Sequence, residues 1–220
     1  MKSLFGLIKK ASSRRGTKLF KLYEAKDYAK MVEAAETMKP AQFLRETVED
    51  FTLVHRCVLD DNVEALQHLA RLPYIHEVVN NQSNEQGWTP LLFAARSSNK
   101  TDLQAFDLLV QCGADLMLPK QSDGINCLHI AATTNDVQLL DYIFLALGSE
   151  LKQHIHSRNN EGWTAAHFSA FLNNFDSLNF LLENGAKLTD RNDQGMTPVE
   201  EMIRNDHKDL LSCIYQLVKH

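Results

Sequence analysis

The sequence predicts an all-α solenoid in which tandem helix pairs, joined by short β-hairpin turns, follow a helical N-terminal cap. Three observations lead to this fold class. A turn glycine, a polar residue two positions later and then a helical run recur along the chain. Small alanine pairs lie inside these runs, and the copies return at a nearly constant interval. Repeated spacing of this kind indicates one structural unit used several times.

Four copies of the motif begin at glycines that are 37, 38 and 33 residues apart. These turn glycines are Gly87, Gly124, Gly162 and Gly195. A fifth copy lacks the glycine and begins at Phe51, which lies 37 residues before the equivalent Trp88.

Each part of the copy around Gly87 has a physical reason. Glycine readily adopts the positive φ that a tight turn needs. Thr89 is a good helix cap, and Pro90 at the first helical position loses no useful N–H. The pair Ala94-Ala95 lets this helix approach its neighbours closely. A second helix with apolar residues at spacings of three and four follows, and Gly113 supplies its left-handed C-cap.

This pattern resembles the ankyrin repeat, and the resemblance covers about residues 48–220. The histidine of the family signature Thr-Pro-Leu-His-x-Ala is present as His55, His129 and His167. Two other copies carry a leucine or a glutamate there. The resemblance implies that the three histidines bond to threonine or backbone groups and join neighbouring repeats.

The same pattern divides the chain into a tail, a cap and repeats. Apolar stripes at helical spacing in Lys18–Thr37, broken near Lys26-Asp27, predict a helix pair that covers one end of the stack. The expected segments are a basic amphipathic tail at 1–16, a helical cap region at 17–50, repeats at about 51–83, 84–120, 121–158 and 159–191, and a C-terminal cap at 192–220. Residues in excess of the family period of about 33 are expected around Arg71–Asn84, Asn99–Asp102 and Leu147–Arg158.

Composition excludes several classes of protein. A hydrophobic fraction of 44% and a charged fraction of 23% are typical of a folded chain. No run approaches eighteen apolar residues, so no membrane-spanning helix is expected. Residues 1–23 carry seven basic residues and no acid, and the rest holds 23 − 7 = 16 basic against 28 acidic residues, a net charge of −12. An acidic body argues against a nucleic-acid partner.

The four cysteines, Cys57, Cys112, Cys127 and Cys213, are far apart and form no Cys-x-x-Cys pair. Disulfide frameworks and zinc knuckles need closer spacing. The spacing therefore predicts buried reduced thiols and a cytoplasmic, reducing environment.

Catalytic, cofactor-binding and metal-binding signatures are absent from the sequence. The motif histidines recur at one repeat position, which favours a stacking role over catalysis or metal binding. His154 and His156 form an isolated His-x-His pair without a third or fourth ligand, which favours a solvated loop over a zinc site. The sequence therefore predicts a non-enzymatic protein with no cofactor and no metal.

Side chains around the motif predict a protein-binding surface. The resemblance implies a concave groove lined by the turns and the first helices. The residue after each turn is apolar in all five copies, and Phe171 and Leu172 occupy a helix face that normally carries polar residues. The expected binding residues are Trp88, Arg96, Ile125, Thr133, Trp163, Phe171, Leu172 and Met196. Alternatively, the tryptophans after the turns pack along the hairpins as structure.

The tail Met1–Arg15 has an amphipathic helical pattern with basic side chains opposite an apolar face. Five interpretations remain open. The tail binds an anionic membrane surface, targets an organelle, or docks on a partner or on the repeats. It is phosphorylated at Arg14-Arg15-Gly16-Thr17, or it is mobile and only favours solubility.

The expected function is that of a non-enzymatic adaptor or scaffold subunit that binds a protein partner through the groove. Two alternatives remain. One is a regulatory or inhibitory subunit that occludes the active site of an enzyme, and the other is a membrane-associated effector anchored by the basic tail. Ankyrin stacks bind unrelated partners on one scaffold, so the sequence names neither the partner nor an oligomeric state.

Overall fold

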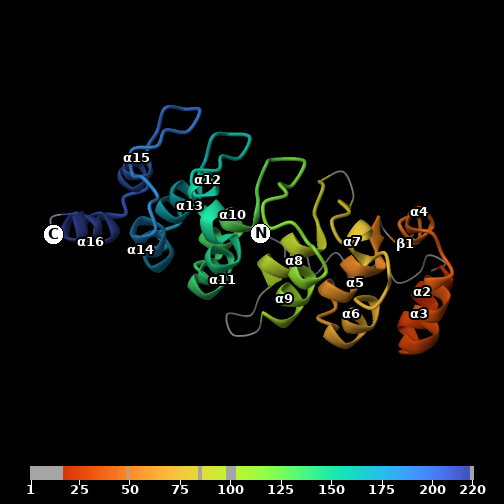
Figure 1. The fold of residues 1–220 in the computed structure, drawn as a ribbon. Coiled ribbons are helices and arrows are strands. Elements are labelled where there is room, and N and C mark those ends of the chain that lie inside the picture. Colours follow the sequence, from red (N-terminus) through yellow and green to blue (C-terminus); the bar gives the residue numbers. More distant parts are fainter. Residues whose placement is uncertain (1–16, 49, 84–85, 98–102, 219–220) are drawn as a thin grey trace.

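The computed structural model describes residues 17–48, 50–83, 86–97 and 103–218. In this part of the chain, helix pairs stack side by side into an elongated solenoid, and the connections between the pairs project to one side as narrow fingers (Figure 1). The fold class is therefore the one that the repeat pattern predicts. The tail at 1–16, with its predicted amphipathic helix, lies outside the described residues.

A helical cap covers the N-terminal end of the stack (Figure 1). Its elements are α2 (Lys18–Glu24), α3 (Tyr28–Glu36), α4 (Pro40–Phe43) and a short antiparallel pair, β1 (Thr47–Val48) and β2 (Phe51–Thr52). The break between α2 and α3 falls at Ala25–Asp27, as the sequence predicts. A partly buried polar contact joins the cap to the first repeat: the Tyr28 hydroxyl accepts a 2.9 Å hydrogen bond from Nδ2 of Asn62.

Five helix pairs follow the cap. The inner helices are α5 (Leu53–Leu59), α8 (Pro90–Ser97), α10 (Cys127–Thr134), α13 (Ala165–Phe171) and α15 (Pro198–Arg204). The outer helices are α6 (Val63–Leu69), α9 (Gln104–Gln111), α11 (Val137–Leu147), α14 (Phe175–Glu183) and α16 (Lys208–Val218). Two of the three predicted insertions contain short helices, α7 (Ile75–Val78), and η1 (Gly148–Glu150) with α12 (Leu151–His154). The third, Asn99–Asp102, lies outside the described residues.

The turn from an inner to an outer helix is set by polar residues. Asp61, Asn135, Asn173 and Asp206 have φ between 53° and 60°, a left-handed conformation that Asn and Asp tolerate better than other non-glycine residues. The following residue often caps the outer helix. Asp136, for example, accepts a 3.0 Å hydrogen bond from the backbone N–H of Leu139.

The core runs along the stack between the inner helices. Each inner helix contacts the next one in chain order. Ala95, Ala132 and Ala170 lie at equivalent positions and are fully buried, so small side chains set the close approach of neighbouring helices. Apolar residues of the outer helices, such as Leu109 and Leu139, fill the space behind them.

Backbone hydrogen bonds link each finger to the next one. The N–H of Asn160 donates to the carbonyl of Asp123 at 2.8 Å, and the N–H of Asp193 donates to the carbonyl of Glu161 at 3.0 Å. Figure 1 shows these connections projecting side by side. The fingers therefore continue the stack beyond the helices.

Glycine is required where one finger approaches the next. Gly162 has φ +77°, and a Cβ there would lie 2.7 Å from the backbone nitrogen of Asp193. Gly195 has nearly the same φ of +76°, but no atom lies within 4 Å of an added Cβ. The turn conformation therefore explains both glycines, and close approach of the neighbouring finger adds a second requirement at Gly162.

The motif histidines join the inner helices to the next finger. Nε2 of His55, His129 and His167 lies 3.0, 3.1 and 3.1 Å from the carbonyl oxygens of Trp88, Ser157 and Met196, respectively. Because a carbonyl oxygen only accepts, Nε2 carries the ring proton and Nδ1 is an acceptor. Nδ1 of His129 accepts from the backbone N–H of Asn126 at 3.1 Å. These contacts confirm the joining role that the family resemblance implies.

Burial keeps these imidazoles neutral. Desolvation lowers the pKa of His55 and of His129 to about 4, although the carbonyl contacts act in the opposite direction. The pKa of His167 is also lowered, again mainly by burial. Protonation of His129 at Nδ1 would also place the new N–H against the backbone N–H of Asn126, which donates to Nδ1.

We expect Gly162→Ala to destabilise the fold more than Gly195→Ala. Both changes place a Cβ at positive φ, which costs about 1–2 kcal/mol. Only Gly162→Ala also forces Cβ against the Asp193 backbone, and such overpacking adds about 1–3 kcal/mol. Urea unfolding of both variants measures the difference. Equal losses would show that the contact between fingers does not constrain this turn.

We expect the free energy of unfolding to decrease as the pH is lowered, because of the buried histidines. A depressed folded-state pKa means that the unfolded chain binds protons first, so stability is fully present above the unfolded pKa of about 6.5 and is lost as the pH falls towards 4. Up to about 3 kcal/mol is lost per histidine with a folded-state pKa of about 4.

The variant His129→Gln should be less stable than the wild type at pH 7 and should lose less stability on acidification. Urea unfolding at several pH values between 7 and 4.5 measures both slopes. Parallel slopes would contradict the assignment of His129 as one of the groups that take up protons on unfolding.

Candidate protein-binding surface

One exposed side chain lies at the same register in the last turn of each of four inner helices. It lies seven residues after the residue that caps or precedes the helix, which is Thr89, Asn126, Thr164 or Thr197. We call the four side chains the inner-helix row; they are Arg96, Thr133, Phe171 and Arg204, and all are exposed. Packed helices lie about 8–10 Å apart, so the row forms a line of side chains across four adjacent repeats.

The apolar centre of this surface lies at the end of α13. Phe171 and Leu172 are adjacent and are 40% and 41% exposed. The ring of Phe171 contacts the half-buried Trp163 edge to face, with a centroid distance of 5.3 Å. We call these three residues the Phe171 patch. Large apolar side chains exposed side by side mark interaction sites more often than isolated ones do.

Trp88 differs from the expectation of an exposed groove residue, because it is only 6% exposed. Its ring stacks on Phe93 with a centroid distance of 4.8 Å. The charged ends of Lys120 and Arg96 lie 4.8 and 5.3 Å from the ring centroid. Trp88 therefore has a structural packing role, which is the alternative given above for this position. Its ring also makes a cation–π contact with the exposed Arg96.

The other expected residues contribute mainly through their backbone or their own helix. Ile125 and Met196 are half-buried in the fingers. The carbonyl of Ile125 accepts from the N–H of Lys120 at 2.7 Å, and the carbonyl of Met196 accepts from His167. Thr133 is exposed, but its hydroxyl donates to the carbonyl of His129 at 2.7 Å. Of the expected residues, the structure brings Phe171 against Trp163 and Arg96 against Trp88, and Leu172 follows Phe171 in the chain.

Four exposed apolar residues were not expected from the sequence, and one of them is Leu145 of α11, which is 76% exposed. Phe175 at the start of α14 is 38% exposed, and Ile203 and Tyr215 in the last helix pair are 60% and 61% exposed. Helical spacing places Phe175 on the same apolar stripe as the buried Leu178, so the sequence does not indicate that Phe175 is exposed. Ile203 is equivalent to Ala95, Ala132 and Ala170, which are buried. The motif position alone therefore does not predict that Ile203 is exposed.

The loop predicted to be solvated around His154 and His156 also makes a specific contact. Nδ1 of His156 lies 2.7 Å from Oδ2 of Asp190, which belongs to the next finger. Both side chains remain partly exposed. This pair joins two repeats.

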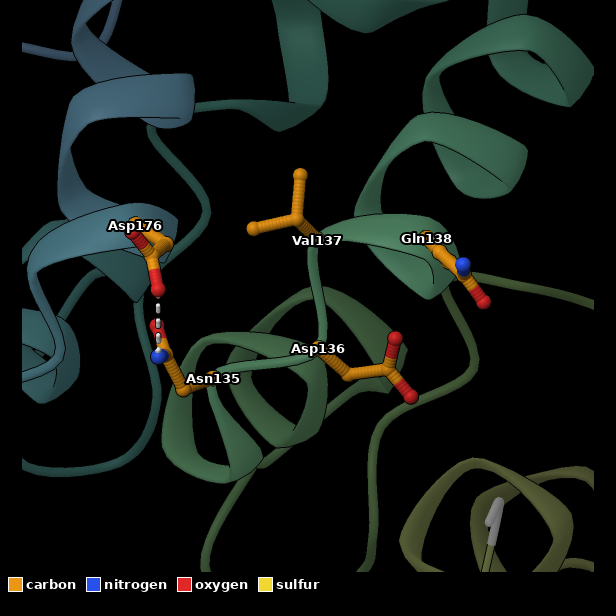
Figure 2. A pocket seen from close by; sticks show the side chains of 5 residues that line it. All are labelled: Asn135, Asp136, Val137, Gln138 and Asp176. Carbon is orange, nitrogen blue, oxygen red and sulfur yellow. Dashed lines mark hydrogen bonds between the residues drawn. The ribbon is translucent and has the colours of Figure 1, made fainter. Parts of the chain in front are cut away.

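An open hollow of about 440 Å³ lies between α11 and α14 and is lined by Asn135, Asp136, Val137, Gln138 and Asp176. Figure 2 shows Asp176 and Asn135 pointing towards one another. Nδ2 of Asn135 donates to Asp176 at 3.2 Å, while its Oδ1 accepts from the N–H of Ser177 at 2.9 Å. These contacts of Asn135 therefore join two repeats.

Nucleophilic and metal-binding groups do not gather on the described surface. Burial raises the pKa of the Cys57 and Cys127 thiols, which makes the reactive thiolate unfavourable. Within residues 17–218, apart from the gaps noted above, no three His, Cys, Asp or Glu side chains are grouped as metal ligands. Among the described helices, none has the length and apolar character to cross a membrane.

Curated proteins that are similar to this chain are much longer than it is. The chain is 30% identical over 86 residues to the inhibitor of Bruton tyrosine kinase from Xenopus laevis, covering 39% of this chain and 6% of that protein. It is 28% identical over 135 residues to the human NF-kappa-B inhibitor zeta, covering 60% and 18%. It is 26% identical over 145 residues to the bovine mitochondrial disaggregase, covering 62% and 20%. The chain thus spans about a fifth of these relatives or less.

The family comparison agrees with the repeat pattern and with the fold. A family model described as ankyrin repeats in three copies matches residues 97–192 and 128–219, which together exceed half of the chain. The matched region contains the inner helices α10, α13 and α15 and their fingers. The chain belongs to the ankyrin-repeat family.

Proposed function

We propose that the chain is a non-enzymatic adaptor or scaffold subunit that binds a protein partner through the inner-helix row and the Phe171 patch. One observation carries the proposal. Phe171 and Leu172 are 40% and 41% exposed at a register where α8, α10 and α15 carry polar or charged residues. Aromatic residues next to arginines are typical of the few side chains that dominate binding energy. Family membership supports a binding role, since ankyrin repeats mediate protein–protein interaction.

A non-enzymatic role is supported by the state of the reactive groups. The motif histidines are buried and are engaged with backbone carbonyls. The thiols of Cys57 and Cys127 are buried, and burial raises their pKa. The free thiols of Cys57, Cys112 and Cys127 are buried and support the proposal of a reducing, cytoplasmic compartment. Cys213, which the sequence predicts to be buried, is exposed.

A regulatory or inhibitory subunit is the second candidate. It is favoured by the names of two similar proteins, an inhibitor of NF-kappa-B and an inhibitor of Bruton tyrosine kinase. An inhibitor and a scaffold would use the same surface, and they differ only in what happens to the bound partner. Measurement of the activity of a captured partner, with and without this chain, distinguishes the two. A membrane-associated effector depends on residues outside the described part of the chain.

We expect the double substitution Phe171→Ala with Leu172→Ala to weaken partner binding by about 30-fold or more, which corresponds to about 2 kcal/mol. Stability should fall by no more than about 1–2 kcal/mol, because both side chains are already two-fifths exposed. Quantitative affinity capture from native extract, followed by titration of the purified partner, measures binding. Urea unfolding measures stability.

Leu145→Ala is the matched control. Leu145 is an apolar residue of the outer helix α11 and is 76% exposed. Its loss should leave binding unchanged. Equal retention of partners by the double variant and the control would overturn the proposal. Trp88→Ala is unsuitable for this test, because removal of a buried tryptophan costs about 3–5 kcal/mol of stability.

A further inference from the structure

We propose that the partner segment is acidic with a large apolar residue at its centre. The apolar residue packs on Phe171 and Leu172, and carboxylates on either side of it pair with Arg96 and Arg204. This inference rests on the function proposed above and specifies the chemistry of the ligand for the same surface.

The two arginines lie on either side of the Phe171 patch in the same row. Helix α15 contacts α13, and α10 separates α13 from α8. With packed helices about 8–10 Å apart, Arg204 lies about one helix spacing from Phe171 and Arg96 about two spacings away on the other side. Thr133, between Arg96 and Phe171, adds no charge.

The fingers beside the row carry three ion pairs. Arg158 lies 2.6 Å from Asp193, and Arg191 lies 3.3 Å from Glu200. Lys120, although it also faces Trp88, lies 2.6 Å from Asp123 and is buried. These pairs offset the negative charge of Asp123, Asp193 and Glu200, whereas the exposed Glu161 forms no ion pair within the described residues.

Arg96 and Arg204 are differently placed. Both are exposed, and within the described residues neither forms an ion pair with a carboxylate. Nη1 of Arg204 contacts only the amide oxygen of Gln194, at a long 3.5 Å. Arg96 rests on the face of Trp88, a contact that leaves the edge of the guanidinium open. A guanidinium edge is suited to bidentate pairing with a carboxylate.

The spacing of the row determines the spacing of the ligand. An extended segment rises about 3.3 Å per residue. A segment that crosses the helices therefore needs a carboxylate about three residues from its apolar centre on one side and about six residues on the other. The acidic body, with a net charge of 16 − 28 = −12 over residues 24–220, disfavours long runs of acidic residues. It selects two local carboxylates instead.

A random library of displayed 16-residue peptides, selected on the full chain, tests the inference. Bound peptides should carry an apolar residue with Asp or Glu at about these two distances. Arg96→Glu and Arg204→Glu should each weaken the selected peptides by about tenfold or more, as expected for loss of a charge-assisted pair. Replacing the facing carboxylate by lysine should restore binding to the Arg204→Glu variant.

Lys187→Glu is the matched charge control. Lys187 is exposed beyond the end of α14, and its replacement changes the net charge as much as each arginine variant does. It should leave peptide affinity within about twofold. Raising the salt concentration should weaken the wild type more than the double variant Arg96→Glu with Arg204→Glu.

The outcomes separate this inference from the proposed function. Peptides that are lost with Phe171→Ala and Leu172→Ala but unaffected by the arginine variants would overturn the acidic ligand and retain the apolar surface. Peptides unaffected by either set, or a selection without enrichment, would overturn both. Loss with Lys187→Glu as well would reduce the effect to overall charge and would also overturn the inference.

Discussion

The bond from a buried imidazole to the carbonyl of the next finger is the interaction on which the rest of the structure depends. It occurs at His55, His129 and His167 and each time connects a helix cap to the following repeat. The neutral ring must direct its Nε2–H at this carbonyl. The bond therefore constrains the position of the inner helix relative to the next finger. Where leucine replaces the histidine, at Leu92, the apolar side chain is buried in the core instead.

This coupling determines which side chains remain free. Residues that face a neighbouring repeat, such as Ala132 and Ala170, are fully buried and small. The inner-helix row lies in the last turns of α8, α10, α13 and α15, and its side chains are exposed, so their chemistry is open to variation. The chain has arginine, threonine, phenylalanine and arginine there, in the order of the stack. Phe171 and Leu172 are two-fifths exposed for this reason, and binding of a partner would cover them at little cost to the fold.

Local rules made most of the fold predictable. Gly124 and Gly162 have positive φ because their turns require it, and the recurrence of histidine at one position indicated a shared structural role. The states of the two tryptophans were not predictable in this way. Trp88 and Trp163 occupy the same motif position, but Trp88 is covered by Phe93, Lys120 and Arg96, whereas Trp163 meets the exposed Phe171. The exposure of the two tryptophans therefore differs because different side chains surround them, and the motif does not specify those side chains. The His156–Asp190 pair joins residues 34 positions apart and was missed for the same reason.

The location of partner contact is the central claim, and photo-crosslinking tests it most directly. A benzophenone amino acid in place of Thr133 would stand between Arg96 and Phe171 in the inner-helix row. The same group in place of Leu145 would stand on the outer helix α11, at a site that is 76% exposed. We predict a covalent adduct with one protein partner from position 133 and none from position 145. An adduct from position 145 with none from position 133 would show that the partner binds the outer helices and would contradict the account.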